Sequence, residues 1–421
     1  MLAKPATSLD SNAGAPLHPK VVEALLPLFS PSNSNSEYAA GTVDSGQLDR
    51  LGMTLGNPSS QHSAGRRARS SLQRSREQVS ASIGATDSSQ IIFTSSGTES
   101  IQLALRSRFE PSLRSGIKPH LITTRVEHEA TLQMIEWLQS HGGSVSYLDL
   151  DAQGRPQAAS FERAWNEAGS AAKSAGGIVL SAIWVNNESG VISDVRALAA
   201  EGRARGVYVH FDGAQAWGKL ASLDVAKLGA NAVSFSAHKI GGLAGTGVLW
   251  VDAAMAPSEG LLRGKQEQGR RGGTENLVGI VAVGAAAAGI QDGLIARLTA
   301  LEKARDALEK QVVGQVGGIV VNGAGAPRVP NTLNFSIEGI EGSTLVQSLD
   351  LDGFAVSAGS ACASGVPQPS HVLLALGRDE RLAKASLRLS FAEPLETALI
   401  AEFTNALAAH VARMRKVRNT S

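Results

Sequence analysis

Short apolar runs alternate with helix-like segments through the first two thirds of the chain, and this alternation constrains the fold more than any other feature. The apolar runs are the length of strands and rich in β-branched or aromatic residues: they cover 91–93, 121–124, 145–148, 178–185, 207–211, 232–235 and 248–251. Helical periodicity marks 19–29, 65–83, 98–109, 130–140, 161–171 and 195–205. This pattern predicts a mostly parallel, seven-stranded sheet with helices on both faces.

The last third of the chain predicts a second, smaller α/β unit. Its predicted helices cover 294–312, 343–349, 371–376 and 395–414, and its strands cover 319–321, 332–337 and 387–391. With 421 residues, the chain is long enough for two or three domains. We therefore predict a large domain over 19–293 and a small domain that begins at 294 and runs to 421.

Polar residues follow several predicted strands, at the edge where open α/β sheets bind ligands. They are Thr98, His128, Asn187, Asp212 and Lys239. Ser96 and Glu99 have capping-box spacing just before the helix 98–109, so a helix N-terminus that suits a phosphate is expected beside them. An ordinary helix cap explains Thr98 equally well, and a surface histidine explains His128 equally well. Simple turn chemistry is the alternative for Asn187.

Lys239 follows the apolar run 232–235 and precedes a glycine-rich loop. A lone loop lysine is more commonly a solvated side chain. A lysine among apolar neighbours can also lose its proton and form a Schiff base with a carbonyl cofactor. Asp212, if buried, needs a cation to face. A phosphate, a ring, a basic ring nitrogen and an aldehyde together describe pyridoxal 5'-phosphate, and the ordered set of residues favours that cofactor.

Composition limits the other function classes. The 39 basic and 38 acidic side chains leave a net charge of +1, which gives no sign of a nucleic-acid or membrane partner. The uncharged segment 277–291 is too short for a membrane span and is predicted to be a buried helix. No targeting segment is visible, so a cytoplasmic location is expected. The single cysteine, Cys362, excludes an internal disulfide, and no metal site is predicted.

Four segments resemble the signature motifs of the cysteine desulfurases, pyridoxal-phosphate enzymes of the aminotransferase superfamily. They are 185–188 (VNNE), 234–239 (SFSAHK), 270–276 (RRGGTEN) and 357–364 (SAGSACAS). The similarity runs from about residue 9 to about residue 400 in the same motif order. The resemblance implies an aminotransferase-type fold in which residues 1–18 join the small domain 294–421.

The resemblance also implies a role for each candidate residue. Lys239 would carry the cofactor, Asp212 would pair with its pyridine nitrogen, Gln215 would bond its ring hydroxyl, and His128 would stack on its ring. Asn187 and Arg388 would hold the substrate carboxylate. The phosphate would be bound by Gly97, Thr98, Ser236 and His238, and by Thr274 of a neighbouring subunit, which implies a homodimer with shared sites.

Cys362 lies in a run of small residues with no helix or strand period, which predicts a loop. A lone cysteine is commonly a buried small hydrophobe. The resemblance makes Cys362 the nucleophile that takes sulfur, with His128 as a proton acceptor. The chain departs from the family at Asp10–Ala15, where paired threonines are missing, at 31–47, which resembles an insertion, and at Gln102, where asparagine is common.

These inferences predict a cysteine desulfurase that converts L-cysteine to L-alanine, with the sulfur held as a Cys362 persulfide for iron-sulfur cluster or thio-cofactor synthesis. A sulfur-acceptor or scaffold protein is the expected partner. A selenocysteine lyase shares the same motifs and is the nearest alternative. An aminotransferase in which Cys362 is incidental, and a scaffold that binds the cofactor without turnover, are further alternatives.

Overall fold

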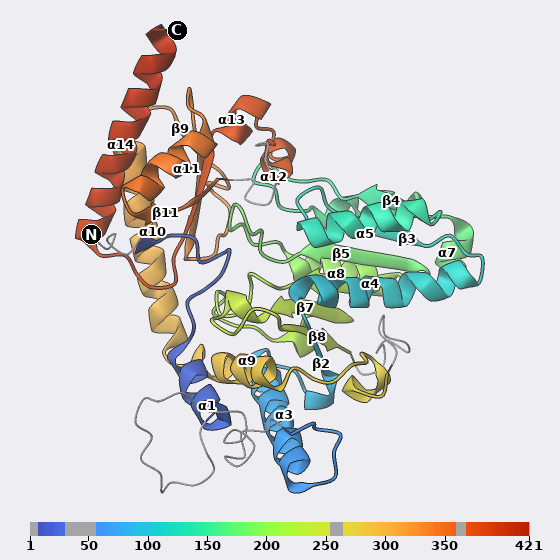
Figure 1. The fold of residues 1–421 in the computed structure, drawn as a ribbon. Helices are drawn as coiled ribbons and strands as arrows, with labels where there is room; N and C mark the ends of the chain where they lie inside the picture. The colour runs from blue at the N-terminus through green and yellow to red at the C-terminus, as the bar shows by residue number, and fades with distance from the viewer. Residues whose placement is uncertain (1–6, 30–55, 253–263, 359–367, 421) are drawn as a thin grey trace, which may run out of the picture.

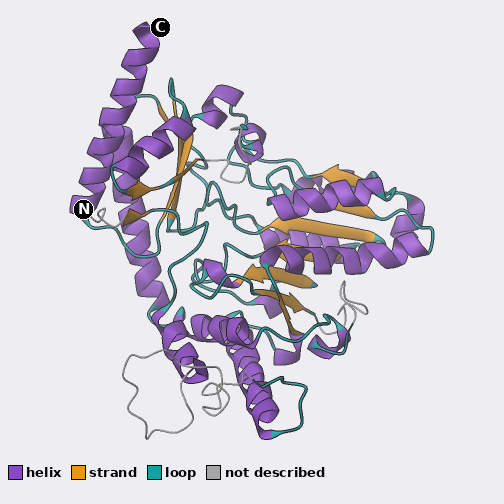
Figure 2. Ribbon diagram, in the orientation of Figure 1, coloured by secondary structure: helices purple, strands orange, loops and turns teal. Residues whose placement is uncertain are grey.

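The computed structural model describes residues 7–29, 56–252, 264–358 and 368–420. A seven-stranded sheet forms the centre of the larger part (Figure 1; Figure 2). Its strands lie in the order β2 (Ile91–Thr94), β8 (Gly247–Val251), β7 (Ala232–Ser236), β6 (Tyr208–Asp212), β5 (Ile178–Ile183), β3 (His120–Thr123) and β4 (Ser144–Tyr147). Neighbouring strands are parallel except for β8, which is antiparallel to both of its neighbours, β2 and β7. The predicted sheet is confirmed.

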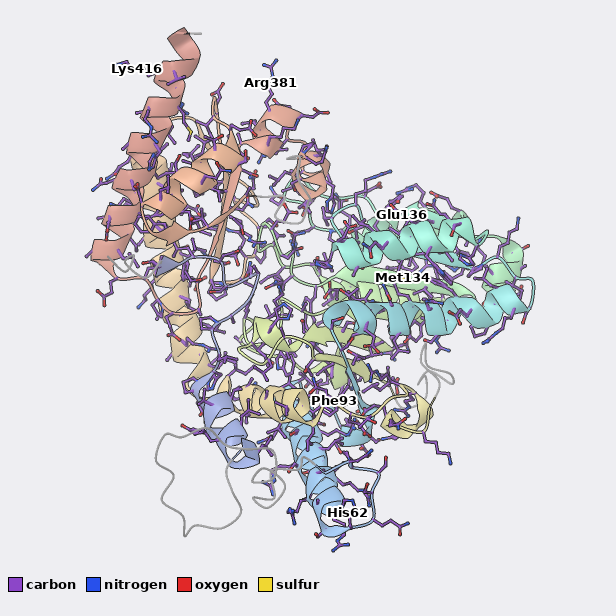
Figure 3. All side chains as sticks on the ribbon, viewed as in Figure 1. His62, Phe93, Met134, Glu136, Arg381 and Lys416 are labelled. Atoms are coloured by element: carbon purple, nitrogen blue, oxygen red, sulfur yellow. The ribbon has the colours of Figure 1, made fainter. Side chains whose placement is uncertain are left out.

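Helices cover both faces of the sheet, because successive strand residues point to opposite sides. On one face, Ile92 packs with α4 (Gly97–Arg114) and α5 (Glu129–Ser140). On the other, its neighbours Ile91 and Phe93 pack with α3 (Ser63–Ser82), α8 (Val195–Ala204) and α9 (Leu277–Gly289). Within α5, Met134 is buried and Glu136 is exposed (Figure 3). The helix therefore presents its apolar side to the sheet.

One predicted helix is wrong in its extent. The segment 161–171 forms two short helices, α6 (Phe161–Asn166) and α7 (Ser170–Ser174). Gly169 is the N-cap of the second helix in an extended conformation, and glycine followed by serine has low helix propensity. Apolar periodicity alone did not reveal this break.

The smaller part is built on a second, antiparallel sheet (Figure 1). Its order is β12 (Ser357–Ala358), β13 (Ser386–Ser390), β10 (Thr332–Ile337) and β9 (Ile319–Val321). The helices α10 (Leu294–Gln315) and α14 (Thr397–Thr420) lie side by side on it (Figure 1). The remaining helices are α11 (Gly342–Leu351), α12 (His371–Ala375) and α13 (Glu380–Lys384), the last of which the sequence did not predict.

The N-terminal residues join this smaller part. Strand β1 (Thr7–Ser8) pairs in parallel with β11 (Phe354–Ala355), and Leu9 is buried in the core formed by residues 294–411. From there the chain crosses to the large sheet and forms α1 (Pro19–Phe29), whose Val21 is in the other core. We propose, on these separate cores, that residues 19–293 form one domain and that 1–18 and 294–421 form the other.

The helix predicted over 277–291 is confirmed as α9, and ten of its 13 residues are buried in the protein. No single helix in the described ranges has the length and apolar composition of a membrane span. The pair α9 and α10 meets that test only when the two helices are joined across a bend of 81°.

Candidate functional site

The candidate residues that follow β2, β3, β5, β6 and β7 lie together at the edge of the large sheet where the carboxyl ends of these strands meet. His128 is the N-cap of α5, directly after the β3 turn. Asp212 is the last residue of β6, and Lys239 ends the short 3-10 helix η4 (Ala237–Lys239) after β7. The parallel register thus places groups from distant parts of the sequence at the mouth of one crevice, as the rule for open sheets predicts.

Asp212 is a buried carboxyl group among positive charges. Its side chain is 4% exposed, and its Oδ1 accepts a hydrogen bond from the backbone N–H of Ala214 at 3.0 Å. Burial raises the pKa of Asp212, while the charges of His128 and Lys239 and the bond from Ala214 lower it. A protonated ring nitrogen would give this carboxylate the close counter-ion that a buried charge requires.

The amine of Lys239 contacts the N-terminal segment. Its Nζ donates to the backbone carbonyl oxygens of Asn12 at 2.6 Å and Ala13 at 2.9 Å. The same segment is fixed to η4 by a bond from the backbone N–H of Ala15 to the His238 carbonyl at 2.8 Å. Lys239 is half-buried, and a cavity of about 390 Å³ beside α1 reaches it.

Asn12 connects more of the site than sequence analysis indicated. Its side chain is 2% exposed, and its Nδ2 donates to the Thr332 hydroxyl of the small sheet at 2.9 Å. The backbone carbonyl oxygen of Asn12 also accepts a hydrogen bond from Gln215 Nε2 at 3.1 Å. Its Oδ1 accepts a bond from the amine of Lys219 at 2.7 Å. Asn12 lies in the segment that departs from the family, and that departure was the only sequence signal for it.

The N-terminus of α4 lies beside the end of β7. A Cβ on Gly97 would approach the Ser236 Cβ to 3.2 Å, so glycine allows this close packing. The Ser96 hydroxyl accepts a bond from the Glu99 N–H at 3.1 Å and caps the helix. The Ser236 hydroxyl lies 3.0 Å from His238 Nδ1, and burial, followed by the charge of Lys239, lowers the pKa of His238 to about 4. The side chain of Thr98 is exposed in the first turn. Backbone N–H groups, hydroxyls and a neutral imidazole thus surround a position that suits a phosphate.

Only half of the predicted capping box forms. The carboxylate of Glu99 accepts bonds from the N–H and the hydroxyl of Ser95 rather than from the N–H of Ser96. It also forms an ion pair with Arg271 at 2.9 Å. The competing cation, which is distant in sequence, explains why spacing alone did not predict this geometry.

Two buried glutamates beside the site were not singled out by the sequence. Glu127 Oε1 accepts bonds from the Thr124 hydroxyl at 2.5 Å and the Ile183 N–H at 3.1 Å. Burial raises the pKa of Glu127 to about 8, and the charge of Asp212 adds to this effect. Glu188 accepts a bond from the Ser370 hydroxyl at 2.5 Å, and burial raises its pKa to about 7. Both are therefore candidates for carboxyl groups that hold a proton near neutral pH.

Arg388 brings the small sheet to the site. It lies on β13, is 4% exposed, and donates to Asp10 Oδ1 at 2.5 Å and to the Asn187 carbonyl at 3.3 Å. Its Nη2 also donates to the Ser357 hydroxyl at 3.2 Å. Within the described residues its Nε has no hydrogen-bond partner although it is buried. Arg388 therefore has a donor left for a further acceptor such as a carboxylate.

Thr274 lines a different cavity from the one that reaches Lys239. Thr274 is exposed and lines a cavity of about 210 Å³ beside Thr94 and Ser95, near the end of β2. Cys362 lies outside the described residues, as do the loop predicted around it and the segment 31–47. In the described part of the chain, no three His, Cys, Asp or Glu side chains are placed to bind a metal ion.

Comparisons with known proteins identify the family. The model of the class-V aminotransferases matches residues 47–397. An IscS-like cysteine desulfurase from Mycobacterium tuberculosis is 33% identical over 413 residues, which is 97% of each chain. The chain belongs to the cysteine desulfurase family.

Other members agree over nearly the whole length. Cysteine desulfurase IscS from Dictyoglomus turgidum is 34% identical over 386 residues, covering 91% of this chain and 88% of the relative. The solved structure of a NifS-like protein superimposes with a TM-score of 0.81 at 27% identity, covering 97% of this chain and 99% of the other. The structure of SspA in complex with cysteine has a TM-score of 0.72 at 26% identity and covers 93% and 99% of the two chains. This desulfurase-family chain has the class-V aminotransferase fold and is an enzyme of that class.

Proposed function

We propose that this protein is a cysteine desulfurase that converts L-cysteine to L-alanine and transfers the sulfur to Cys362. The observation that carries the proposal is the buried carboxyl of Asp212, which faces the charges of His128 and Lys239 at the mouth of the crevice. Family membership directs the choice among reactions that this arrangement could serve.

The residues of the crevice fit pyridoxal 5'-phosphate. Asp212 would face the pyridine nitrogen, and His128 would lie over the ring. Gln215 would bond the ring hydroxyl, and Lys239 would bind the aldehyde carbon. The phosphate would be held by Gly97, Thr98, Ser236 and His238. The fit rests on a buried acid beside His128 and Lys239, on a glycine that permits close packing at the α4 N-terminus, and on a lysine amine that donates to two backbone carbonyl oxygens.

The bound cofactor would supply an acceptor for electrons from the substrate Cα. The protein's part is to bind, orient and move protons. Lys239 would remove the proton from Cα, while Asp212 would hold a proton at the ring nitrogen. Arg388 Nε and the Asn187 amide would hold the substrate carboxylate, because Arg388 is already fixed by Asp10 and its buried Nε has no partner among the described residues.

Sulfur transfer needs a nucleophile, and Cys362 is the only cysteine in the chain. Its thiolate would attack the sulfur of L-cysteine, so that a new S–S bond forms as the substrate C–S bond breaks. The carbon keeps the bonding electrons, takes up protons and leaves as alanine, and Cys362 is left as a persulfide. His128 would accept the thiol proton. Support comes from Ser357, which lies five residues before Cys362 in the sequence and whose hydroxyl is bonded to Arg388.

The active form would be a homodimer. Thr274 is exposed on its own subunit near the end of β2, so it is available to reach the phosphate of a partner site. The persulfide would be passed to a sulfur-acceptor or scaffold protein for iron-sulfur cluster or thio-cofactor synthesis, in the cytoplasm.

The persulfide test separates this reaction from other uses of the cofactor. L-cysteine under non-reducing conditions is expected to release alanine and to add one sulfur to the peptide that contains Cys362, as measured by mass spectrometry. Cys362→Ala should keep cofactor binding and lose desulfuration, because only the second needs the thiol.

The outcomes discriminate among the alternatives. Alanine formation by Cys362→Ala at the parent rate would refute the role of the thiol. Activity of that variant on selenocysteine alone would favour a selenocysteine lyase. A requirement for a keto-acid acceptor would indicate an aminotransferase, and cofactor binding without any turnover would indicate a scaffold.

A further inference from the structure

A second lysine lies within the candidate site and has no role in the reaction as proposed. Lys219 is 8% exposed, and its amine donates to Asn12 Oδ1 at 2.7 Å and to Gln215 Oε1. Both partners are uncharged amides. Within the described residues, no carboxylate forms an ion pair with Lys219. A buried ammonium without a counter-ion is costly, so this position favours a neutral amine.

The contacts of Lys219 determine how the Gln215 amide is turned. Because Lys219 donates to Gln215 Oε1, the Nε2 end of the amide must point the other way. That end donates to the backbone carbonyl of Asn12 at 3.1 Å. The same carbonyl oxygen accepts the amine of Lys239 at 2.6 Å. Lys219, Gln215 and Asn12 thus form a closed set of hydrogen bonds around the acceptor of Lys239.

Charges around the two lysines act in the same direction. Burial, followed by the charges of Lys239 and Arg388, lowers the pKa of Lys219 well below its usual value. Because such interactions are mutual, any positive charge on Lys219 also opposes protonation of Lys239. The other ionisable groups that face this pair are Asp212 and His238 from the crevice, and His18, Asp292, Arg297 and Glu393 around the cavity beside α1.

We propose that Lys219 is a positioning residue, which orients the Gln215 amide and the Asn12 carbonyl so that the Lys239 amine is held in place and the Gln215 oxygen is kept turned away from it. The proposal deepens the proposed function, because it concerns the lysine that would bind the cofactor. Lys219 itself touches neither reacting atoms nor substrate in this role. It acts through Gln215 and Asn12.

Lys219→Met would remove the donor while keeping a side chain of similar length. Gln215 could then turn its Oε1 toward Lys239 and accept from it, which would favour the ammonium form. This added acceptor would therefore make Lys239 harder to deprotonate.

The test measures the amine of Lys239 directly in the full-length chain freed of cofactor. Acetic anhydride at limiting concentration, followed by mass spectrometry of the Lys239 peptide, gives labelling as a function of pH. In Lys219→Met the midpoint is expected to move up by about one pH unit, which is roughly a tenfold loss of reactivity below the midpoint. The matched control is Lys310→Met, which changes an exposed lysine on α10 and should leave the midpoint at the parent value.

A conservative replacement separates positioning from simple packing. Lys219→Arg keeps hydrogen-bond donors, and the cavity of about 390 Å³ that Lys219 lines gives room for the longer side chain. Lys219→Arg should restore most of the parent midpoint, whereas Lys219→Leu, which also lacks a donor, should behave like the methionine variant. If Lys219→Met does not melt cooperatively, the arginine and leucine variants provide the same comparison.

An unchanged or lowered midpoint in the folded variants without the donor would overturn the proposal. In the holoenzyme, the pH midpoint of the cofactor's visible absorbance should shift upward in the same variants. A failure of Cys362 to form a persulfide would refute the proposed function. It would not affect the labelling comparison, because labelling of Lys239 requires no turnover.

Discussion

Glu127→Gln is expected to alter how the free energy of unfolding depends on pH. At low pH its effect on the free energy of unfolding itself is expected to be smaller. The carboxyl group is fully buried, and its Oε1 accepts bonds from Thr124 and Ile183, which an amide oxygen can also accept. Its Oε2 has no partner among the described residues. Glutamine therefore preserves the shape and the two bonds while removing the ionisable group.

The size of the effect follows from the pKa of Glu127, which burial raises from 4.5 to about 8. Between these values the folded state holds a proton that the unfolded state has lost, so the parent loses stability as the pH rises. The loss is about 1.4 kcal/mol per pH unit and reaches roughly 5 kcal/mol once the folded carboxyl ionises. The glutamine variant lacks this loss. Its stability relative to the parent should therefore grow by about 2–3 kcal/mol between about pH 5.5 and about pH 7.5.

Urea denaturation followed by circular dichroism, at fixed protein concentration and several pH values, measures this difference. Glu136→Gln is the matched control, because Glu136 lies on the adjoining helix with its side chain exposed (Figure 3). Its curve should run parallel to that of the parent. If the Glu127→Gln curve is also parallel, within about 0.5 kcal/mol over the window, the inference that Glu127 is protonated in the folded protein is wrong.

Two further substitutions test how the site is supported. Arg76→Met should lower the free energy of unfolding, measured by urea denaturation, by about 3–5 kcal/mol, because it leaves Glu267, bonded to Arg76 at 2.7 Å, buried without a counter-ion. Arg76→Met combined with Glu267→Gln should lower it less. An equal or larger loss in the double variant would contradict the unpaired-charge explanation. Gly247→Ala would place a Cβ 2.2 Å from the Ser96 carbonyl oxygen, so it should displace the N-terminus of α4 and weaken cofactor retention measured by dialysis. A Cβ on Gly314 would meet nothing within 4 Å, so Gly314→Ala serves as the control. Equal cofactor retention in the two variants would count against a phosphate at the α4 N-terminus.

The strands, most helices and the crevice residues could be predicted because their signals are local. Apolar runs of strand length mark β2 to β8, and helix periodicity marks α3, α5 and α8. Once a parallel sheet is inferred, residues that follow its strands must meet at one edge. Asp212 and Lys239 could therefore be placed together before their contacts were known.

What the sequence alone did not reveal depends on contacts between distant segments. The spacing of Ser96 and Glu99 predicted a capping box, but Arg271 drew the carboxylate to another partner. Arg388 was assigned to the substrate by resemblance, while its ion pair with Asp10 joins strand β13 to the N-terminal segment. Neither pairing leaves a periodic trace in the sequence.

Asn12 and Lys219 show the same limit most clearly. An asparagine in a turn and a lysine after a glycine read as surface residues, because their local patterns carry no apolar period. The tertiary structure buries both when residues 10–16 cross from the small sheet to the large one, and it gives them each other as partners. The sequence determined which residues surround the crevice, since strand order places them there. Only the folding of the N-terminal segment across the crevice decided which backbone carbonyls hold Lys239 in place.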